Sequence, residues 1–354
     1  MTPYDANFDG QKLMYHPARV AQWLERGSTC GPLYTEATLS DQCNCRCLFC
    51  GVDYDVRRTG AVLDAGTWTG ILDDLADLGN KAVMFSGHGE PLLHPRAAEI
   101  IGHGARRMSA SVTTNGIALD EAGMELIDAL EWIRFSVNAG TPEAYARVHG
   151  ARPDAFDRVL ANLAAAVERK RCKGLAVTIG VQCVLLDENA DTAVALARRV
   201  REIGVDYFSL KPYSRHPLSR NRLDVDYARH ADIGREVQAL QTTTFKVVVR
   251  TGSIAKLGGK KPYGTCHGTH FLCFLSANGD VWECNSYAGD PRFRIGNARE
   301  ERLAGIWNGP RRREVLEFIR TGLNLDECRD VCRMDECNRY LWRLKHPWPH
   351  DNFV

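Results

Sequence analysis

Four cysteines are crowded into eight positions of the stretch Asp41–Gly51. Three of them, Cys43, Cys47 and Cys50, have the spacing C-x3-C-x2-C. Thiolates are soft ligands that favour zinc, copper(I) or iron–sulfur clusters. A structural zinc ion normally takes four protein ligands, whereas three thiolates can hold three corners of a [4Fe–4S] cluster and leave one iron open. We therefore predict an open cluster with Cys45 outside its ligand set; a zinc knuckle is the alternative.

The other cysteines support metal binding. The chain has 13 cysteines, most of them in the segments 43–50, 266–284 and 328–337. No signal peptide and no apolar run of membrane-spanning length is evident, so we expect a cytoplasmic protein. In a reducing compartment, clustered cysteines indicate metal ligands or catalytic thiols rather than disulfides.

The charge balance excludes some partners. Of 354 residues, 45 are Lys or Arg and 44 are Asp or Glu. Because the positive and negative charges nearly balance, the composition gives no reason to expect nucleic acid or an anionic membrane as the main partner.

The elements that would position the cysteines alternate between strands and helices. Apolar runs predict six strands, at 32–40, 81–87, 109–116, 131–140, 174–186 and 205–213. Amphipathic stretches predict helices at 68–78, 94–107, 120–130, 141–148, 159–167, 190–203 and 224–240. Such repeats indicate parallel strands buried on both faces, in a doubly wound sheet or in a full or partial (β/α) barrel. Periodicity alone does not choose between these.

A boundary follows this region. The Gly- and Lys-rich segment 251–265 interrupts the alternation, and 269–284 then reads as a hairpin with its turn at Asn278-Gly279. We therefore predict three parts: an N-terminal arm (1–31), a core (32–250) and a small cysteine-rich domain (251–354).

With Phe49 before the third cysteine, the loop resembles the C-x3-C-x-aromatic-C signature of the radical S-adenosylmethionine (radical SAM) superfamily. The segment 86–91, SGHGEP, resembles that family's Gly-Gly-Glu motif, although His88 stands where a glycine is common. The resemblance implies a partial (β/α)6 TIM-type barrel. It also implies a [4Fe–4S] cluster that binds S-adenosylmethionine and, with one electron, generates a 5′-deoxyadenosyl radical.

The resemblance assigns cofactor-binding residues at the carboxyl ends of the strands, where α/β barrels build their sites. Glu90 would hold the methionine ammonium, and the ribose and carboxylate would meet polar side chains. The implied set is Phe49, Gly87, Gly89, Glu90, Thr114, Asn115, Ser136, Asn138 and, more weakly supported, Gln182.

The second cysteine group resembles the auxiliary-cluster domains called SPASM and twitch, which begin C-x12-G-x4-C as Cys266 and Cys284 do here. Too few cysteines remain for a full SPASM domain with two clusters. The resemblance implies one auxiliary [4Fe–4S] cluster held by Cys266, Cys284, Cys328 and Cys332, with Cys337 able to replace Cys332. A zinc site with the same ligands is the alternative.

By family analogy the substrate is expected to be a small polyol or sugar, oxidised at a carbinol, with a flavodoxin or ferredoxin as reductant. Only about thirty residues precede the core, fewer than the separate leader-binding domain of many peptide-modifying members needs. Candidate catalytic residues are Lys211, Arg215 and Cys273. If Cys273 donated a hydrogen atom, the outcome would be epimerisation. Peptide modification is the further alternative.

Overall fold

The computed structural model describes residues 12–54, 60 and 62–353. Within these residues ten strands form one sheet in the order β10-β9-β8-β1-β2-β3-β4-β5-β6-β7. The strands are β1 (Tyr34–Ala37), β2 (Ala82–Phe85), β3 (Ser109–Thr114), β4 (Trp132–Ser136), β5 (Thr178–Leu185), β6 (Tyr207–Pro212), β7 (Lys246–Val249), β8 (Leu272–Leu275), β9 (Asp280–Trp282) and β10 (Arg294–Asn297). All neighbours from β8 through β1 to β7 are parallel, and the pairs β8–β9 and β9–β10 are antiparallel.

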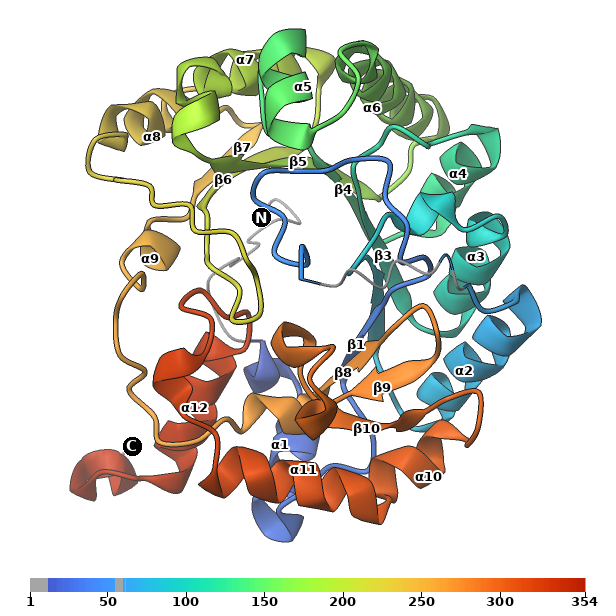
Figure 1. The fold of residues 1–354 in the computed structure, drawn as a ribbon, viewed down its shortest axis with the longest axis vertical. Helices are drawn as coiled ribbons and strands as arrows, with labels where there is room; N and C mark the ends of the chain where they lie inside the picture. The colour runs from blue at the N-terminus through green and yellow to red at the C-terminus, as the bar shows by residue number, and fades with distance from the viewer. Residues whose placement is uncertain (1–11, 55–59, 61, 354) are drawn as a thin grey trace.

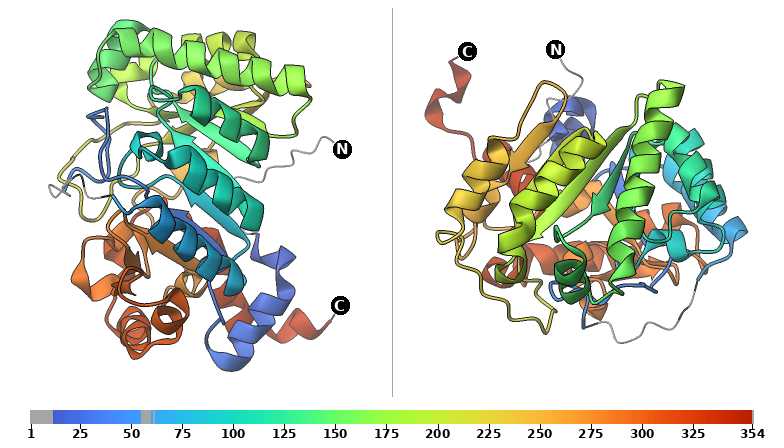
Figure 2. Two further views of the ribbon diagram at one scale, coloured as in Figure 1. Left: turned by 90° about the vertical axis from the view of Figure 1, so that its right-hand side faces the viewer. Right: turned by 90° about the horizontal axis from the view of Figure 1, so that it is seen from above.

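Helices cover the outer face of this curved sheet (Figure 1). They are α1 (Pro17–Arg26), α2 (Ala65–Asp77), α3 (Ala97–Arg107), α4 (Glu121–Leu126), α5 (Pro142–His149), α6 (Asp154–Lys173), α7 (Ala193–Ile203), α8 (Ala231–Gln238), α9 (Thr251–Ile254), α10 (Leu303–Asn308), α11 (Pro310–Thr321) and α12 (Asp335–Lys345). In the side view, α1 and the C-terminal helices lie together at one end of the molecule, and α5–α7 lie at the opposite end (Figure 2). No helix in the described part of the chain is both long and apolar enough to cross a bilayer.

Local sequence explains why these helices begin where they do. The Asp64 side chain accepts a hydrogen bond from Thr67 N at 2.9 Å and caps α2. Thr141 caps α5, with Pro142 at its first position as the sequence predicts. The predicted apolar stripe of α2 is buried against the sheet, at Trp68, Ile71, Leu72 and Leu75.

The fold class expected from the sequence is confirmed: this is an α/β protein with a mostly parallel sheet that forms an open, partial barrel. Two details differ from the prediction. The run Lys246–Val249 adds a seventh strand after β6. The C-terminal hairpin also does not stand apart, because β8 pairs in parallel with β1 over Tyr34–Ala37 and Leu272–Leu275. The sheet is therefore continuous between the two predicted regions 32–250 and 251–354, whose division stays a prediction.

A buried ion pair joins this hairpin to the helices outside it. Glu283 follows β9 and is fully buried, and Arg312 in α11 is 2% exposed. The guanidinium donates to both carboxylate oxygens, at 3.0 and 3.1 Å, and lies 3.5 Å from the centre of the Trp307 ring. Each charge is desolvated and depends on the other for compensation.

We expect Arg312→Met to lower the free energy of unfolding by about 3–5 kcal/mol, because it leaves the Glu283 carboxylate buried without a counter-charge. Urea unfolding measures this. The matched control is Arg313→Met at the next, exposed position, which should change stability by less than about 1 kcal/mol. Equal effects of the two substitutions would show that the buried pair has no special role.

Candidate active site

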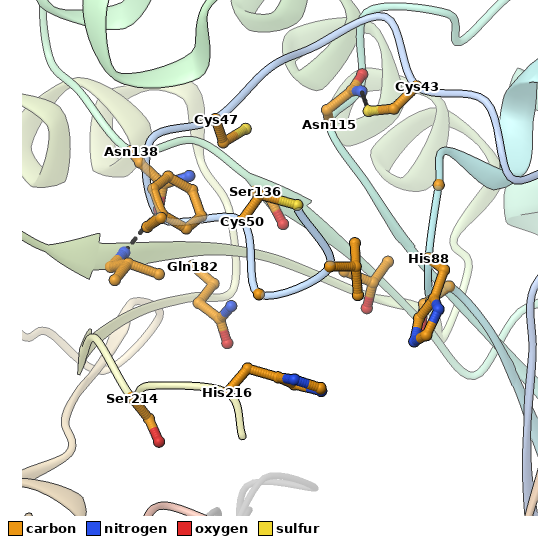
Figure 3. Close-up of a pocket in the computed structure, with 18 of the residues that line it drawn as sticks. Cys43, Cys47, Cys50, His88, Asn115, Ser136, Asn138, Gln182, Ser214 and His216 are labelled. Atoms are coloured by element: carbon orange, nitrogen blue, oxygen red, sulfur yellow. Dashed lines mark hydrogen bonds between the residues drawn. The ribbon is translucent and has the colours of Figure 1, made fainter. Parts of the chain in front are cut away.

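The cysteine loop follows the carboxyl end of β1 and lines a cavity of about 320 Å³ at the mouth of the barrel. Cys43, Cys45, Cys47 and Cys50 all contribute to this lining. Figure 3 shows Cys43, Cys47 and Cys50 around the cavity. Two backbone hydrogen bonds attach the loop to the end of α5: Arg46 N donates to His149 O at 2.8 Å, and Leu48 N donates to Val148 O at 2.9 Å. The three predicted ligands therefore face one cavity, which is the arrangement that a three-thiolate cluster needs.

The segment after β2 packs closely on this loop because it contains glycines. A Cβ atom on Gly87, whose φ is +111°, would lie 1.9 Å from Thr38 Oγ1. A Cβ atom on Gly89 would lie 2.1 Å from Ser40 O. Both contacts are too short for any side chain. The close approach also allows Glu90 N to donate to Gln42 O at 2.8 Å, which links the two loops.

Glu90 presents a buried carboxylate to the cavity. It accepts hydrogen bonds from Thr114 Oγ1 and Asn115 N, both at 2.7 Å, and from Leu92 N at 3.1 Å. Burial raises the pKa of Glu90, while the hydrogen bonds from Asn115, Thr114 and Leu92 oppose the rise. No cationic side chain is paired with Glu90 among the described residues. This site therefore suits a small cationic ligand group such as an ammonium.

The other predicted cofactor residues lie around the same cavity, but they differ in what their side chains contact. Ser136 and Gln182 are register partners on β4 and β5, and both line the cavity. Asn115 Nδ2 donates to Asn44 Oδ1 at 2.6 Å and lies 3.9 Å from Cys43 Sγ. Asn138 Oδ1 instead accepts from Val184 N at 2.6 Å, so this side chain is largely occupied by the scaffold.

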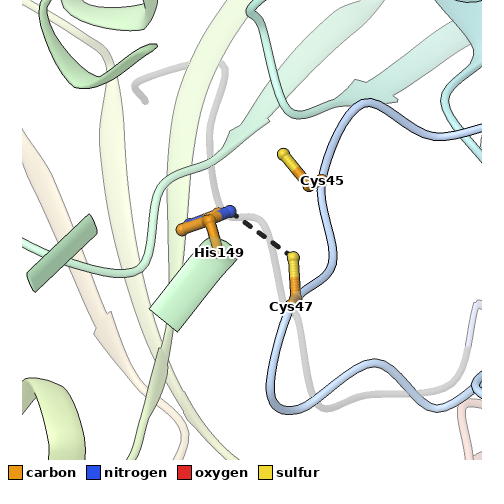
Figure 4. A group of neighbouring side chains, drawn as sticks. All are labelled: Cys45, Cys47 and His149. Atoms are coloured by element: carbon orange, nitrogen blue, oxygen red, sulfur yellow. Dashed lines mark hydrogen bonds between the residues drawn. The ribbon is translucent and has the colours of Figure 1, made fainter. Parts of the chain in front are cut away.

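His149 is a site residue that the sequence reasoning missed. Its ring stacks on Tyr145 at 4.0 Å and meets the edge of Phe49 at 6.1 Å. Its Nδ1 lies 3.5 Å from Cys47 Sγ. The sulfur atoms of Cys45 and Cys47 and a ring nitrogen of His149 all lie within 4.8 Å of one another (Figure 4). The histidine is 102 residues from Cys47 in sequence, and nothing in its local sequence indicates this contact.

The hydrogen bonds of His149 determine its tautomer. The backbone N of Asn138 can only donate, and it donates to Nε2 at 3.0 Å. The ring is neutral because burial lowers the pKa of His149 to about 3. Its single proton is therefore on Nδ1, which donates to Cys47 Sγ. With no lone pair at Nδ1, the ring contacts the sulfur of Cys47 as a donor and is not arranged as a metal ligand.

The three predicted catalytic residues have different positions. Lys211 lines the cavity at the end of β6. Arg215 is exposed and lies outside the described lining of the cavity. Cys273 is fully buried, and β8 is represented in the lining by Phe274 instead. Because successive strand residues face opposite sides, Cys273 points away from the cavity, toward Glu283 and Arg312. This orientation argues against the role of hydrogen-atom donor that epimerisation would require.

The second cysteine group gathers beside the hairpin. Burial first, and then the neighbouring Cys332 thiol, raise the pKa of Cys266 to about 12. The pKa of the Cys284 thiol is raised by burial first and then by the neighbouring thiols of Cys332, Cys266 and Cys328. The four thiols therefore lie within electrostatic range of one another. Thiols that repel one another when ionised are the setting in which a cationic metal centre is stabilising.

Cys337 lies differently. It is in α12 and packs against an apolar cluster. The residues of that cluster are Leu13, Val20, Trp23, Leu33, Phe271 and Leu341. Burial first, and then the neighbouring Cys332 thiol, raise the pKa of Cys337 to about 12. This placement favours Cys332 over Cys337 as the fourth member of the group.

Comparison with known proteins is consistent with this geometry. The model of the radical SAM superfamily matches residues 38–200, and that of the SPASM iron–sulfur cluster-binding domain matches residues 266–338. The PqqA peptide cyclase of Gluconobacter oxydans is 30% identical over 284 residues, which are 78% of this chain and 76% of that protein. The PqqA peptide cyclase of Xanthomonas axonopodis pv. citri is 27% identical over 294 residues, which are 78% of this chain and 74% of that protein.

Solved structures show the same fold. Streptococcus suis SuiB bound to the precursor peptide SuiA has a TM-score of 0.67 at 17% identity, covering 91% of this chain and 75% of that one. SuiB bound to S-adenosylmethionine has a TM-score of 0.66 at 17% identity, covering 91% and 76%.

Replacing Glu90 by glutamine removes the negative charge while keeping the shape of the side chain. We expect the affinity for S-adenosylmethionine to fall by about tenfold to a hundredfold, since a charged hydrogen-bonding group at the ammonium position is lost. Equilibrium dialysis measures binding, and the iron content should stay unchanged. Glu131→Gln, at an exposed carboxylate, serves as the control. Unaltered binding by Glu90→Gln would remove Glu90 from the cofactor site.

Proposed function

Because this chain belongs to the radical SAM superfamily and carries a SPASM iron–sulfur cluster-binding domain, we propose that it modifies a precursor peptide by forming a covalent bond within it. The observation that carries the proposal is the similarity to the PqqA peptide cyclases, which extends over 78% of this chain. A peptide cyclase joins two parts of one chain, so the expected product is a cyclised or cross-linked peptide.

The expectation of a polyol or sugar substrate is wrong, and so are the carbinol oxidation and the epimerisation that depended on it. The relatives that cover most of this chain act on a peptide by name. The expectation rested on the number of residues before the core, and that number does not exclude a peptide substrate. The burial of Cys273 separately removes the proposed donor for epimerisation.

Superfamily members of this kind contain a [4Fe–4S] cluster that binds S-adenosylmethionine, together with an auxiliary cluster. The cysteine loop at the cavity suits the first cluster, and the cysteines beside the hairpin suit the second. Cys43, Cys47 and Cys50 would hold the first cluster. When bound, the cluster and S-adenosylmethionine supply a 5′-deoxyadenosyl radical that removes a hydrogen atom from the substrate. The protein residues orient the cofactor and exclude water.

Glu90 would bind the ammonium of S-adenosylmethionine. Ser136 and Gln182 remain available for its other polar groups, because they line the cavity. His149 would donate its Nδ1 hydrogen bond to the Cys47 thiolate, an arrangement that lowers the energy of an electron-rich sulfur. These roles follow from the contacts of the side chains and remain proposals.

The auxiliary cluster would be held by Cys266, Cys284, Cys328 and Cys332. Asn338 supports this group, because its Nδ2 lies 3.2 Å from Cys266 Sγ and its Oδ1 accepts from His267 N at 2.7 Å. A buried amide with both ends engaged fixes the orientation of the sulfur it contacts.

The two ligand sets can be tested separately. Reconstituted enzyme should contain about eight irons, because each set suits one four-iron cluster. Cys266→Ala with Cys284→Ala should reduce this to about four irons without loss of the first cluster. Cys47→Ala should abolish 5′-deoxyadenosine formation, and Cys45→Ala should retain it. The reverse result for Cys45 and Cys47 would change the ligand assignment, and stoichiometric zinc with only one cluster would exclude the auxiliary cluster.

The proposed reaction can be tested with synthetic peptides that correspond to short reading frames beside the gene. Reduced, reconstituted enzyme with S-adenosylmethionine should convert one of them to a product lighter by two hydrogen atoms. One hydrogen atom would leave to the 5′-deoxyadenosyl radical, and the other would leave as a proton, with its electron passing to the auxiliary cluster. Tandem mass spectrometry measures the mass and locates the bond.

The Cys43→Ala variant is the control and should leave the peptide unchanged. The proposal would be overturned if the active enzyme formed 5′-deoxyadenosine while every such peptide kept its mass.

A further inference from the structure

Three cationic side chains line the cavity at some distance in sequence from one another. Arg134 comes from β4, Lys211 from the end of β6, and Arg329 from the segment between Cys328 and Cys332. We call these three residues the cationic subsite. The Lys211 ammonium is close enough to the other two for their charges to affect its titration.

None of the three has a carboxylate within ion-pair distance in the part of the chain that the structure describes. Arg329 donates to Ser214 Oγ at 3.2 Å and to Ser214 O at 3.3 Å, which are neutral acceptors. Arg134 donates from Nη2 to Thr113 Oγ1 at 3.0 Å, and its buried Nε has no hydrogen-bond partner there. A buried donor without a partner costs free energy unless a ligand satisfies it.

Arg333, the fourth cationic side chain in the lining of the cavity, differs from these three because it has a carboxylate partner. Arg333 forms an ion pair with Glu36, whose other carboxylate oxygen accepts from Asn285 Nδ2 at 2.7 Å. Glu36 is therefore already compensated. Glu90, the other acidic residue in the lining, is held by Thr114, Asn115 and Leu92 on the side of the cysteine loop. The positive charge of the cationic subsite is thus not balanced by the acidic groups of the cavity.

The burial of Lys211 adds to this imbalance. Burial, followed by the charges of Arg329, Arg134 and Arg250, lowers the pKa of Lys211 well below its usual value. An anion in contact with the ammonium would reverse both causes, because it supplies the missing counter-charge. Arginine and lysine together are the side chains that bind carboxylates most strongly in desolvated sites.

We propose that Arg134, Lys211 and Arg329 bind a carboxylate side chain, from Asp or Glu, of the peptide that this enzyme modifies. The inference rests on the proposed function and specifies which kind of residue the peptide must place in the cavity. The carboxylate anchors the peptide beside the position where the hydrogen atom is removed. A peptide held in this way keeps the carbon that loses its hydrogen atom in a fixed position, and such positioning lowers the barrier to reaction.

The position of the subsite favours the substrate over the cofactor as the source of the carboxylate. Arg329 is bonded to Ser214, and Ser214 and His216 lie across the cavity from Cys43 and Cys47 (Figure 3). The ammonium site at Glu90 is beside the cysteine loop, where its backbone is bonded to Gln42. S-adenosylmethionine carries its ammonium and carboxylate on the same carbon, so both belong near that loop.

The test uses the reconstituted enzyme with S-adenosylmethionine and two pentapeptides with blocked ends, Gly-Gly-Glu-Gly-Gly and Gly-Gly-Gln-Gly-Gly. The glutamate peptide should bind at least about tenfold more tightly, as measured by ligand-observed NMR titration. Lys211→Met should abolish this preference. Lys260→Met, the same substitution at an exposed lysine, should keep it. If Lys211→Met fails to retain iron, Arg134→Gln replaces it as the variant.

A third pentapeptide, all glycine with a free terminal carboxylate, distinguishes a side chain from a chain end. Tighter binding of this peptide than of the glutamate peptide would overturn the side-chain assignment. Equal binding, or no binding, of the glutamate and glutamine peptides would overturn the subsite. So would a Lys211→Met variant that loses affinity for S-adenosylmethionine and keeps the glutamate preference. A glutamate preference without any covalent change in a peptide would instead contradict the proposed function.

Discussion

Backbone hydrogen bonds between β1 and β8 bring the two cysteine groups of this protein together. The cysteine loop leaves the carboxyl end of β1, and the hairpin that follows Cys266 begins with β8. Their parallel pairing, from Tyr34 opposite Leu272 to Ala37 opposite Leu275, makes the C-terminal hairpin a continuation of the barrel sheet. The distance between the first cluster and the auxiliary cluster is therefore set by strand geometry and does not depend on a flexible hinge between domains.

The hairpin that this pairing holds in place has charged residues on both of its sides. Those on the outer side stabilise the fold, and some of those on the cavity side are available to a ligand. On the outer side of the hairpin, Glu283 and Arg312 compensate each other fully. On the inner side, Glu36 is matched by Arg333, but Lys211 and Arg329 have no carboxylate within ion-pair distance in the described chain. A protein of 45 basic and 44 acidic residues thus concentrates a local excess of positive charge at one wall of its cavity, which net charge alone does not reveal.

Local patterns predicted the parts of this structure that depend on local physics. The C-x3-C-x2-C spacing, the glycines at 87 and 89, and the helix cap at Thr141 each act within a few residues, and the structure has them facing the cavity or starting the helix as expected. Alternation along a strand places Cys273 and Phe274 on opposite faces, but it cannot tell which face of the strand meets the barrel. That depends on the partner strand, β1, which lies more than 200 residues away in sequence. The contact between His149 and Cys47 and the parallel pairing of β8 were likewise beyond reach, because both arise from tertiary packing. The run KVVV of β7 was missed because four residues at the edge of a sheet give little periodic signal.

Arg329 connects the two functions of the C-terminal region. It lies between Cys328 and Cys332, so the same short segment supplies two thiols to the auxiliary site and one guanidinium to the wall of the cavity. Val331 N of the same segment also donates to Ser214 Oγ, at 3.2 Å. A change in the position of this segment would therefore alter the proposed auxiliary site and the charge that lines the cavity together.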